Sequence, residues 1–319
     1  MFEDDQCPEL DQLQDVKDNS TCGKRFSGNS FITGGTDTNP GEWPWMARLL
    51  YNAPQENSGK VTNCGGSHIS RRHVVTAAHC IQDDFKPIVV ALGDSDVTTD
   101  YDCFDAKNGR GCSSSGEACY EEEACAPKHV EVAIKDILIY EKYEYETCSG
   151  CNNIPIFDIA LIVLENPVQF TKFIQPVCLP NLNEKSEGPL TITGWGNTIA
   201  GILKTKTSSI LQELNVEEVQ LSECQTIWKE GFNIDIKTSH LCASTGVHGS
   251  TSCKGDSGGP LVRQVDFFRQ ISELAGVVSF GISTCGNADY PFGFTRIDGE
   301  VNSWLREHVV EELPMKMRN

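Results

Sequence analysis

Short runs of β-branched and other apolar residues recur along most of the chain, and the turn-forming residues Gly, Asn, Asp and Pro lie between them. From residue 32 onward this alternation predicts many short strands, which is typical of an all-β sandwich or barrel. The clearest runs are residues 74–76, 88–92, 137–140, 159–164, 190–193 and 274–279.

Two segments depart from this pattern. Residues 101–127 are rich in Cys, Gly, Ser and Glu, and we expect a surface insertion held by its own disulfides. Residues 301–310 carry Val301, Trp304, Leu305 and His308 at helical spacing, which predicts a C-terminal helix packed on the body. Residues 1–31 are polar and acidic without periodicity, so we interpret them as a propeptide or light chain ahead of a folded domain at 32–310, and 311–319 as a disordered tail.

Charge and composition narrow the class of function. The formal net charge is -19, and no block of Lys and Arg is long enough to follow a phosphate backbone, so nucleic acid is not expected as a partner. The acid excess fits either solubility or attraction to a basic partner. No stretch approaches 18 consecutive apolar residues, and no membrane partner is expected.

The chain has 15 cysteines, and only Cys148 and Cys151 are spaced as C-x-x-C. So many cysteines, without the repeated C-x-x-C pairs that are typical of metal sites, indicate an oxidising compartment. The first residues are acidic, so they resemble neither the basic start nor the apolar core of a secretory signal. We therefore expect a secreted, extracellular protein whose signal, and some further sequence, lie upstream of residue 1.

Three short motifs suggest a chemistry. His79 lies in TAAHC (76–80), Asp158 opens DIAL (158–161), and Ser257 lies in GDSGGP (255–260). The first alone fits a core histidine beside a disulfide, and the second fits a turn aspartate before a buried strand. The third places a serine among glycines on backbone too permissive for an ordinary strand. Together, in the order His, Asp, Ser, these motifs resemble the chymotrypsin-fold (trypsin-like) serine protease family.

The resemblance extends over residues 32 to about 310. ITGG (32–35), PGEWPW (40–45), TGWG (193–196) and VSFG (278–281) also correspond to family motifs. The resemblance implies an all-β fold of two six-stranded antiparallel barrels with a C-terminal helix, and an active site in the crevice between the barrels. The short apolar runs are compatible with this fold.

By resemblance, His79, Asp158 and Ser257 are a catalytic triad. A serine hydroxyl is a poor nucleophile until a base removes its proton, and an imidazole with an ordinary pKa of about 6.5 suits that task near neutral pH. Asp158 then fixes the imidazole tautomer and stabilises the imidazolium. The backbone N–H groups of Gly255 and Ser257 are the expected oxyanion hole.

The resemblance also implies activation from a zymogen. Cleavage before Ile32 by an activating protease frees an α-amino group that pairs with Asp256, and this pairing orders the oxyanion hole; the alternative for Asp256 is a turn residue. Ser30 and Phe31 precede Ile32, where most relatives have Arg or Lys. The dibasic Lys24-Arg25 is either an alternative cleavage site or a solvated pair.

Resemblance assigns eight cysteines. It pairs Cys64–Cys80, Cys224–Cys242 and Cys253–Cys285 within the body, and Cys22–Cys178 between the N-terminal segment and the body. We expect Cys103–Cys125, Cys112–Cys119 and Cys148–Cys151, which leaves Cys7 unpaired; zinc binding by the inserted cysteines is the weaker alternative, since their spacing lacks the C-x-x-C form. The cysteine-bearing loop and Cys22 are similar to invertebrate clip-domain proteases, although no clip domain lies in this sequence.

The substrate pocket departs from the trypsin pattern. Resemblance places Thr251, Ser279, Gly281 and Phe292 at the pocket, with Thr251 at a floor where trypsin has aspartate. A substrate Arg or Lys is then left without a counter-charge, which is costly for a buried cation. Phe292 stands where the family often has glycine, and it either narrows the pocket or is an ordinary core phenylalanine. We expect a preference for small or medium uncharged residues.

The sequence therefore predicts a serine endopeptidase that acts on protein or peptide substrates without a cofactor or a catalytic metal. Calcium binding by Asp94 and Asp96 is open, with two exposed loop acids as the simpler reading. The main functional alternative is a catalytically weak or inactive protease homologue that acts as a binding or cofactor module. All three triad residues are retained, which favours the enzyme.

Overall fold

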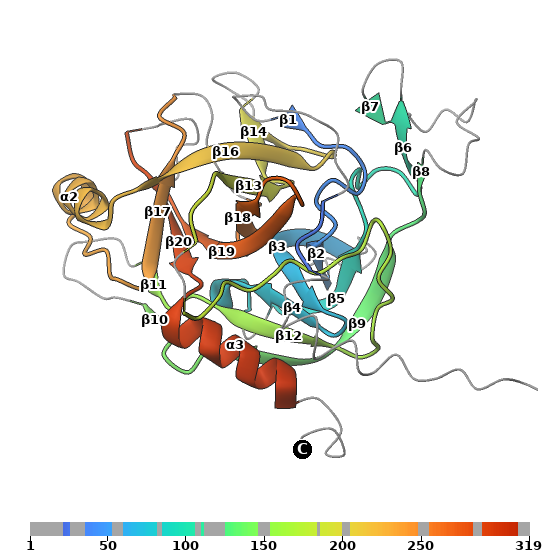
Figure 1. The fold of residues 1–319 in the computed structure, drawn as a ribbon, viewed down its shortest axis with the longest axis horizontal. Helices are drawn as coiled ribbons and strands as arrows, with labels where there is room; N and C mark the ends of the chain where they lie inside the picture. Colours follow the sequence, from blue (N-terminus) through green and yellow to red (C-terminus); the bar gives the residue numbers. More distant parts are fainter. Residues whose placement is uncertain are drawn as a thin grey trace, which may run out of the picture.

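The structure is a computed structural model of the 319-residue chain, and it describes residues 22–25, 36–52, 60–81, 85–105, 110–111, 125–145, 154–183, 186–199, 205–247, 255–282 and 289–311. Two antiparallel β-barrels lie side by side, and a helix covers the lower face of the first (Figure 1). The two-barrel fold predicted from the motifs is therefore confirmed. No helix in the described ranges is long and apolar enough to cross a bilayer.

The first barrel is closed by six strands in the order β12-β4-β3-β2-β5-β9, with β9 paired to β12. Its strands are β2 (Met46–Asn52), β3 (Lys60–Ser70), β4 (His73–Thr76), β5 (Pro87–Leu92), β9 (Val130–Ile139) and β12 (Ala160–Leu164). All five residues of β12 are buried. The predicted runs at 74–76 and 88–92 lie in β4 and β5, residues 160–164 of the run at 159–164 form β12, and residues 137–139 of the run at 137–140 lie at the end of β9.

The second barrel is a sheet in the order β16-β13-β18-β19-β20-β17 that closes through pairing of β16 with β17, and β1 (Thr36–Asp37) adds to the edge of β16. Its strands are β13 (Leu190–Gly194), β16 (Gln212–Val219), β17 (His240–Ser244), β18 (Pro260–Asp266), β19 (Ile271–Phe280) and β20 (Phe292–Arg296). The predicted runs at 190–193 and 274–279 lie in β13 and β19.

Smaller elements decorate the barrels. A three-stranded sheet of β6 (Asp102–Asp105), β7 (Arg110–Gly111) and β8 (Cys125–Ala126) stands in the predicted insertion and projects from the body in Figure 1. Two short hairpins complete the strands: β10 (Glu144–Tyr145) with β11 (Pro155–Ile156), and β14 (Asn197–Ile199) with β15 (Thr205–Thr207). Cys103 and Cys125 are register partners across β6 and β8, a backbone placement compatible with their expected pairing.

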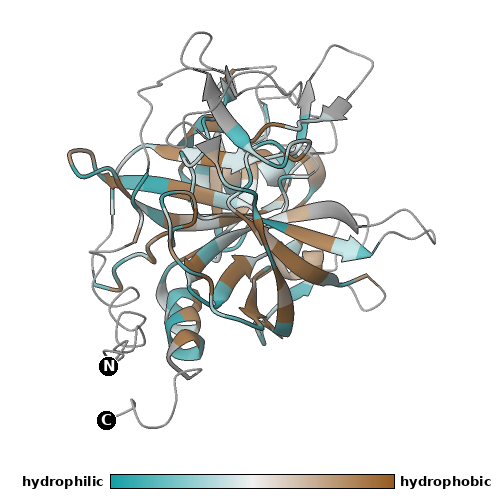
Figure 2. Cartoon of the chain, turned by 90° about the vertical axis from the view of Figure 1, so that its right-hand side faces the viewer, coloured by the Kyte–Doolittle hydropathy of each residue, from teal (hydrophilic) through white to brown (hydrophobic). Residues whose placement is uncertain are grey.

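Two α-helices are described. The predicted C-terminal helix is α3 (Gly299–Glu311), and its Val301, Trp304 and Leu305 are buried in the apolar cluster of the first barrel. Figure 2 shows brown, hydrophobic residues along many strands of the body and mostly teal, hydrophilic residues on this helix. The other helix, α2 (Leu221–Phe232), was not predicted, although Leu221, Cys224, Trp228 and Phe232 on it follow helical spacing and pack in one apolar cluster.

Three disulfides are described, and each matches a pair implied by the family resemblance: Cys22–Cys178, Cys64–Cys80 and Cys224–Cys242. The first attaches the N-terminal segment to the body. The other predicted pairs involve residues outside the described ranges, or cysteines whose side chains are not described, and they stay predictions.

Candidate active site

His79 lies in a one-turn helix, η2 (Ala78–Cys80), directly after strand β4. The turn is fixed on its far side by the Cys64–Cys80 disulfide, and the hydroxyl of Tyr51 donates a hydrogen bond to the carbonyl of Cys80 at 3.1 Å. The imidazole is thus carried by the rigid wall of the first barrel and keeps 22% of its side-chain surface exposed.

Asp158 lies two residues before strand β12 and is completely buried. Its Oδ1 accepts the backbone N–H of His79 at 2.8 Å, and its Oδ2 lies 2.6 Å from Nδ1 of the same residue. The second barrel contributes two further bonds: Ser279 Oγ donates to Oδ2 at 2.6 Å, and Thr295 Oγ1 donates to the Asp158 carbonyl at 2.9 Å. The carboxylate itself thus has three hydrogen-bond partners: the backbone N–H and Nδ1 of His79 and the hydroxyl of Ser279.

The electrostatic environment shifts the pKa of His79. Burial by itself lowers the pKa of an imidazole, but the charge of Asp158 and its hydrogen bond to Nδ1 outweigh that effect, so the pKa of His79 is raised above its usual value. The bond to Asp158 places the proton of the neutral ring on Nδ1 and leaves Nε2 as the basic atom.

Ser257 lies on the turn before β18, and this turn rests against the first barrel. Gly65 donates its N–H to the carbonyl of Ser257 at 2.8 Å. Gly258 has a φ of +76°, and a Cβ there would lie 2.3 Å from Thr76 Oγ1 and 2.6 Å from the Gly65 carbonyl. Glycine is therefore required for this close approach. The structure thus brings the turn of Ser257 next to the end of β4, three residues before His79.

Asp256 is buried, and its environment explains two motif glycines. Its Oδ1 accepts the N–H of Gly196 at 2.9 Å, and a Cβ at Gly194 or Gly196 would fall 2.2 or 2.5 Å from its carboxylate oxygens. The TGWG motif therefore makes room for this side chain, so Asp256 is more than a turn residue. Gly255 has a φ of +104°. Ile32, the predicted partner of Asp256, lies outside the described residues.

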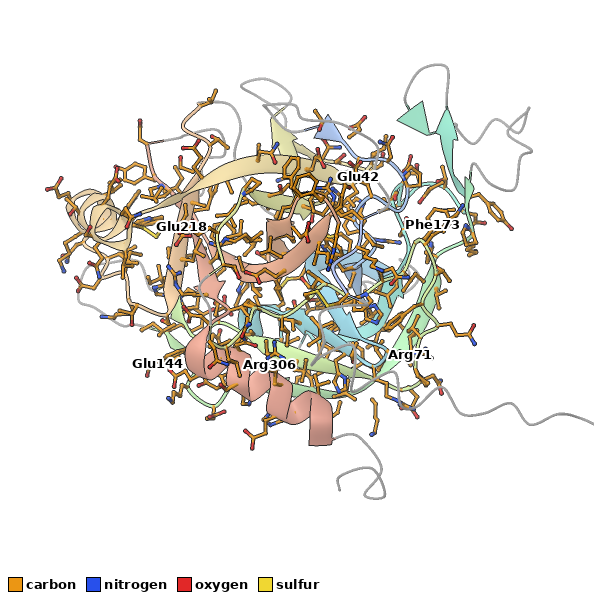
Figure 3. The ribbon with its side chains drawn as sticks, in the orientation of Figure 1. Glu42, Arg71, Glu144, Phe173, Glu218 and Arg306 are labelled. Atoms are coloured by element: carbon orange, nitrogen blue, oxygen red, sulfur yellow. A yellow bond between two sulfur atoms is a disulfide. The ribbon has the colours of Figure 1, made fainter. Side chains whose placement is uncertain are left out.

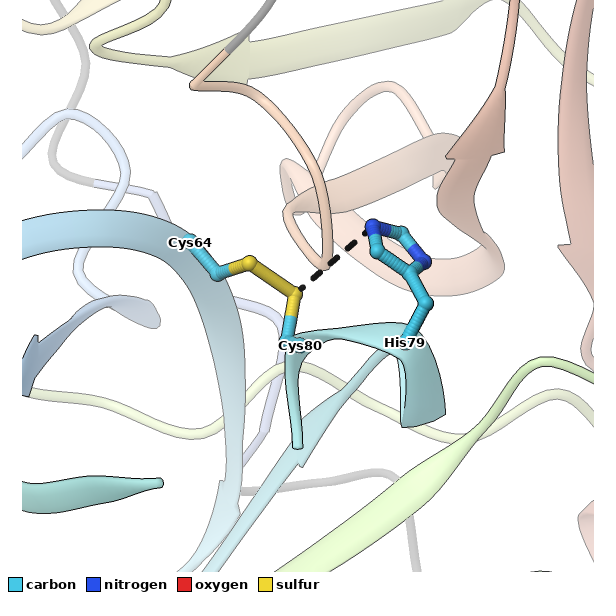
Figure 4. Close-up of side chains that lie close together, drawn as sticks. All are labelled: Cys64, His79 and Cys80. Atoms are coloured by element: carbon cyan, nitrogen blue, oxygen red, sulfur yellow. Dashed lines mark hydrogen bonds between the residues drawn. A yellow bond between two sulfur atoms is a disulfide. The ribbon is translucent and has the colours of Figure 1, made fainter. Parts of the chain in front are cut away.

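One group of described side chains has the composition of a metal site, but its chemistry excludes that reading. Cys64, His79 and Cys80 lie close together, with Nε2 of His79 3.9 Å from Sγ of Cys80 (Figure 4). Both sulfurs belong to one disulfide, so neither provides a thiolate.

The pocket residues are only partly described. Thr251 lies outside the described residues, Ser279 is buried, and Gly281 is exposed with no atom within 4 Å of an added Cβ. Phe292 is 7% exposed and belongs to the apolar cluster of the second barrel. This burial is compatible both with a narrowed pocket and with a core role.

An aromatic contact explains the order of Phe292 and Gly293. A Cβ at Gly293 would lie 2.1 Å from Cζ of Phe280, so the ring of Phe280 lies directly over this glycine. Phe280 also packs edge-to-face on Trp228 of α2, with ring centroids 5.3 Å apart. The sequence reasoning missed this contact, and the glycine at 293, directly after a phenylalanine that stands where the family often has glycine, was the signal that could have found it.

The aspartates considered for calcium are engaged in other contacts. Asp94 is buried and pairs with Arg48, and Nδ1 of His129 lies 3.4 Å from its Oδ2. Asp96 Oδ1 accepts the N–H of Thr98 at 3.0 Å and its hydroxyl at 2.6 Å. The first carboxylate is thus a buried counter-ion, and the second is partly buried and stabilises its own turn, so the interpretation as two exposed loop acids is wrong.

Comparison with known proteins agrees with this geometry. The family model described as Trypsin matches residues 32–114 and 122–305. The chain therefore belongs to the trypsin family, and it is a serine endopeptidase by family and fold.

Individual relatives match most of the chain. The chain is 33% identical over 298 residues to "Melanization protease 1" of Drosophila melanogaster, covering 90% of this chain and 67% of that protein. It is 34% identical over 298 residues to "Phenoloxidase-activating factor 3" of Holotrichia diomphalia, covering 92% and 76%. The crystal structure of the Drosophila Grass clip serine protease of the Toll pathway superposes with a TM-score of 0.70 at 29% identity, covering 95% of this chain and 78% of that one.

Proposed function

We propose that the chain is a secreted endopeptidase in which His79, Asp158 and Ser257 act as a catalytic triad. The observation that supports this most directly is the bond network on Asp158, which fixes the imidazole through Nδ1 and through the backbone N–H of His79. The turn of Ser257 is held against the first barrel beside this network.

In the proposed reaction, Nε2 of His79 takes the proton of Ser257 Oγ while Oγ attacks the carbonyl carbon of the scissile peptide bond. The N–H groups of Gly255 and Ser257 donate to the oxyanion of the tetrahedral intermediate. His79 then gives its proton to the leaving amine, which departs and leaves an acyl-enzyme on Ser257. A water molecule, deprotonated by His79, hydrolyses the ester and restores the serine. Asp158 remains ionised throughout.

The proposal includes activation by another protease that cuts before Ile32. The buried carboxylate of Asp256 next to Gly196 supports a pairing role for the new α-amino group. The proposed substrates are proteins or peptides with a small or medium uncharged residue before the scissile bond, since Thr251 replaces an acidic floor and Phe292 is buried. Secretion is supported by the disulfides Cys22–Cys178, Cys64–Cys80 and Cys224–Cys242.

Labelling by an organophosphonate serine probe after proteolytic activation tests the proposal. The activated chain should be labelled, and Ser257→Ala should lose both labelling and hydrolysis while it keeps its unfolding temperature. The fall in kcat should be of several orders of magnitude, because triad residues act as a unit. Labelling of Ser257→Ala, or undiminished turnover by that variant, would show that the nucleophile is another residue.

A further inference from the structure

The side chain of Arg25 is buried against the body of the protein, although the sequence suggested a solvated pair or a cleavage site for Lys24-Arg25. Its Nη2 lies 3.2 Å from Glu42 Oε1 and 3.9 Å from Glu213 Oε2, and only 15% of its side chain is exposed. Its guanidinium carbon lies 3.9 Å from the centre of the Trp43 ring. Arg25 is therefore held by two carboxylates and one aromatic face.

The two carboxylates are built into the protein independently of Arg25. Glu42 accepts the backbone N–H of Asn39 at 3.0 Å, and Glu213 accepts the indole N–H of Trp43 at 2.9 Å. Their side chains are 2% and 5% exposed. Burial raises the pKa of Glu213, and the neighbouring charge of Glu42 raises it further, while Arg25 opposes both effects. Two buried acids this close need a cation, because an uncompensated buried charge is strongly destabilising.

Arg25 lies at one edge of the segment that contains the proposed cleavage before Ile32. Thr36, at the other edge, is the register partner of Glu213 across β1 and β16. Glu42, labelled in Figure 3, lies near this edge of the second barrel. Glu213 therefore contacts the chain on both sides of residues 26–35.

The residues before Arg25 are also docked. Gly23 donates its N–H to the Pro176 carbonyl at 2.7 Å and accepts the N–H of Ser272 at 2.9 Å. Cys22 is covalently bound to Cys178. Arg25 is the charged end of this short docked stretch.

We propose that Glu42, Trp43 and Glu213 form a guanidinium-binding site, that Arg25 is its ligand, and that this site keeps the N-terminal segment on the protease domain without the help of the Cys22–Cys178 disulfide. The binding site does not depend on the function proposed above. The retention of the N-terminal segment after cleavage rests on that proposed function, since it assumes a cut before Ile32.

The chemistry of the site selects arginine over lysine. A planar guanidinium can lie flat on an indole and direct N–H groups to carboxylates at its edge, whereas an ammonium is a compact, strongly hydrated charge. The occupied site also makes the Lys24-Arg25 pair a poor protease substrate. A protease that cleaves there can bind the Arg25 side chain only after that side chain has left Glu42, Trp43 and Glu213.

Chemical rescue tests the site in the Ser257→Ala background, where no hydrolysis interferes. Arg25→Ala should lower the unfolding temperature by several degrees. Millimolar methylguanidinium should restore much of this loss along a saturable curve in Arg25→Ala and have little effect on the parent. Methylammonium, with the same charge, should not restore it. Adding Trp43→Leu to Arg25→Ala should abolish the rescue.

Three results would overturn the binding site: no loss of stability in Arg25→Ala, equal rescue by methylammonium, or an equal effect of methylguanidinium on the parent. If Arg25→Ala does not fold, its refolding yield becomes the measurement. Recovery with methylguanidinium but not with methylammonium supports the site, and no recovery with either refutes it. Arg25→Lys should be less stable than the parent, and parent-like stability would refute the selection for a guanidinium.

Retention of the segment is tested separately, so that its failure is distinct from failure of the proposed function. A site for a sequence-specific endopeptidase is placed at residues 28–31 in a chain that also carries Cys22→Ser and Cys178→Ser. After cleavage the N-terminal segment should co-elute with the protease domain in gel filtration, and Arg25→Ala should release it. Release with Arg25 intact would show that the disulfide alone holds the segment.

Discussion

Ser279 donates a hydrogen bond to Asp158 at 2.6 Å, on the same carboxylate oxygen that lies 2.6 Å from Nδ1 of His79. Ser279 belongs to β19 of the second barrel, whereas Asp158 precedes β12 of the first. The bond therefore crosses the boundary between the barrels and links the charge of Asp158 to the correct docking of one barrel on the other.

Ser279→Ala should lower kcat/KM about tenfold, because a hydrogen bond to a charged group contributes roughly 1.5–3 kcal/mol and Asp158 has few other donors. Steady-state kinetics on a peptide substrate measure this. Ser272→Ala is the matched control: Ser272 is buried on the same strand, and its hydroxyl has no hydrogen-bond partner among the residues that the structure describes. Equal losses in both variants would indicate damage to β19 instead of a specific role for Ser279.

The acid limb of activity should have its midpoint above pH 6.5. The pKa of His79 is raised, mainly by the Asp158 charge against the opposing effect of burial, and the protonated ring cannot accept the serine proton, so activity is lost as the pH falls through this raised pKa. In Asp158→Asn the ring of His79 remains buried, but the neighbouring negative charge of the carboxylate is lost. The midpoint should move to lower pH while kcat falls by several orders of magnitude. Asp96→Asn, on an exposed turn, should leave the profile unchanged.

Activity should also decline in alkali. The α-amino group of Ile32 is charged at neutral pH and loses its proton as the pH rises, which ends its proposed pairing with Asp256. Activity measured between pH 5 and pH 10 on the activated chain should give a bell-shaped curve. A flat profile over this range would contradict the proposed roles of both His79 and Ile32.

His68 should make the fold sensitive to acid. Its ring is completely buried, neither ring nitrogen has a hydrogen-bond partner of good geometry among the described residues, and burial, assisted by the charge of His73, lowers its pKa to about 3. The unfolded chain takes up this proton below about pH 6.5 and the folded chain does not. Stability is therefore complete above that pH and falls between 6.5 and 3, by about 1.4 kcal/mol per pH unit for one such group.

His68→Leu should shift the acid unfolding midpoint to lower pH and have little effect at pH 8, as measured by circular dichroism. His308→Gln, on the partly exposed side of α3, is the control and should move the midpoint much less, because the charge of His308 is the smallest of the effects that lower the pKa of His73. A parallel loss of stability in His68→Leu at both pH values would instead indicate a packing role for the ring. His73, whose pKa is lowered to about 4, adds to the same acid sensitivity and is retained in both variants.

Phe292→Gly should widen the substrate pocket. The ring is buried, and its removal should raise kcat/KM for Phe and Tyr before the scissile bond relative to Ala and Val by about tenfold or more, the discrimination typical of an apolar pocket. Profiling both enzymes on a peptide library gives the answer. An unchanged preference would assign Phe292 to the core alone, and a dominant Arg/Lys preference in the parent would refute the pocket floor at Thr251.

Much of this protein was determined by local sequence. The motifs around His79, Asp158 and Ser257 predicted the family by resemblance, because each motif is a short contiguous stretch that can be compared without knowledge of the fold. The short apolar runs predicted strands such as β4 and β12, since the spacing of apolar residues and the preference of β-branched residues for strands are properties of a few neighbouring residues. The helix α3 was predicted for the same reason.

Other features were decided only by the tertiary structure. Gly194 and Gly196 are required by the Asp256 side chain, which is about 60 residues away in the chain, and Gly293 is required by the ring of Phe280. Arg25 appeared to be half of a solvated dibasic pair, yet Glu213 and Trp43 reach it from distant parts of the chain. A sequence pattern reports what a residue prefers among its neighbours along the chain. Burial, counter-charge and close contact depend on which distant segments meet, and in these examples the segments meet within the second barrel and where residues 25 and 42–43 pack against it.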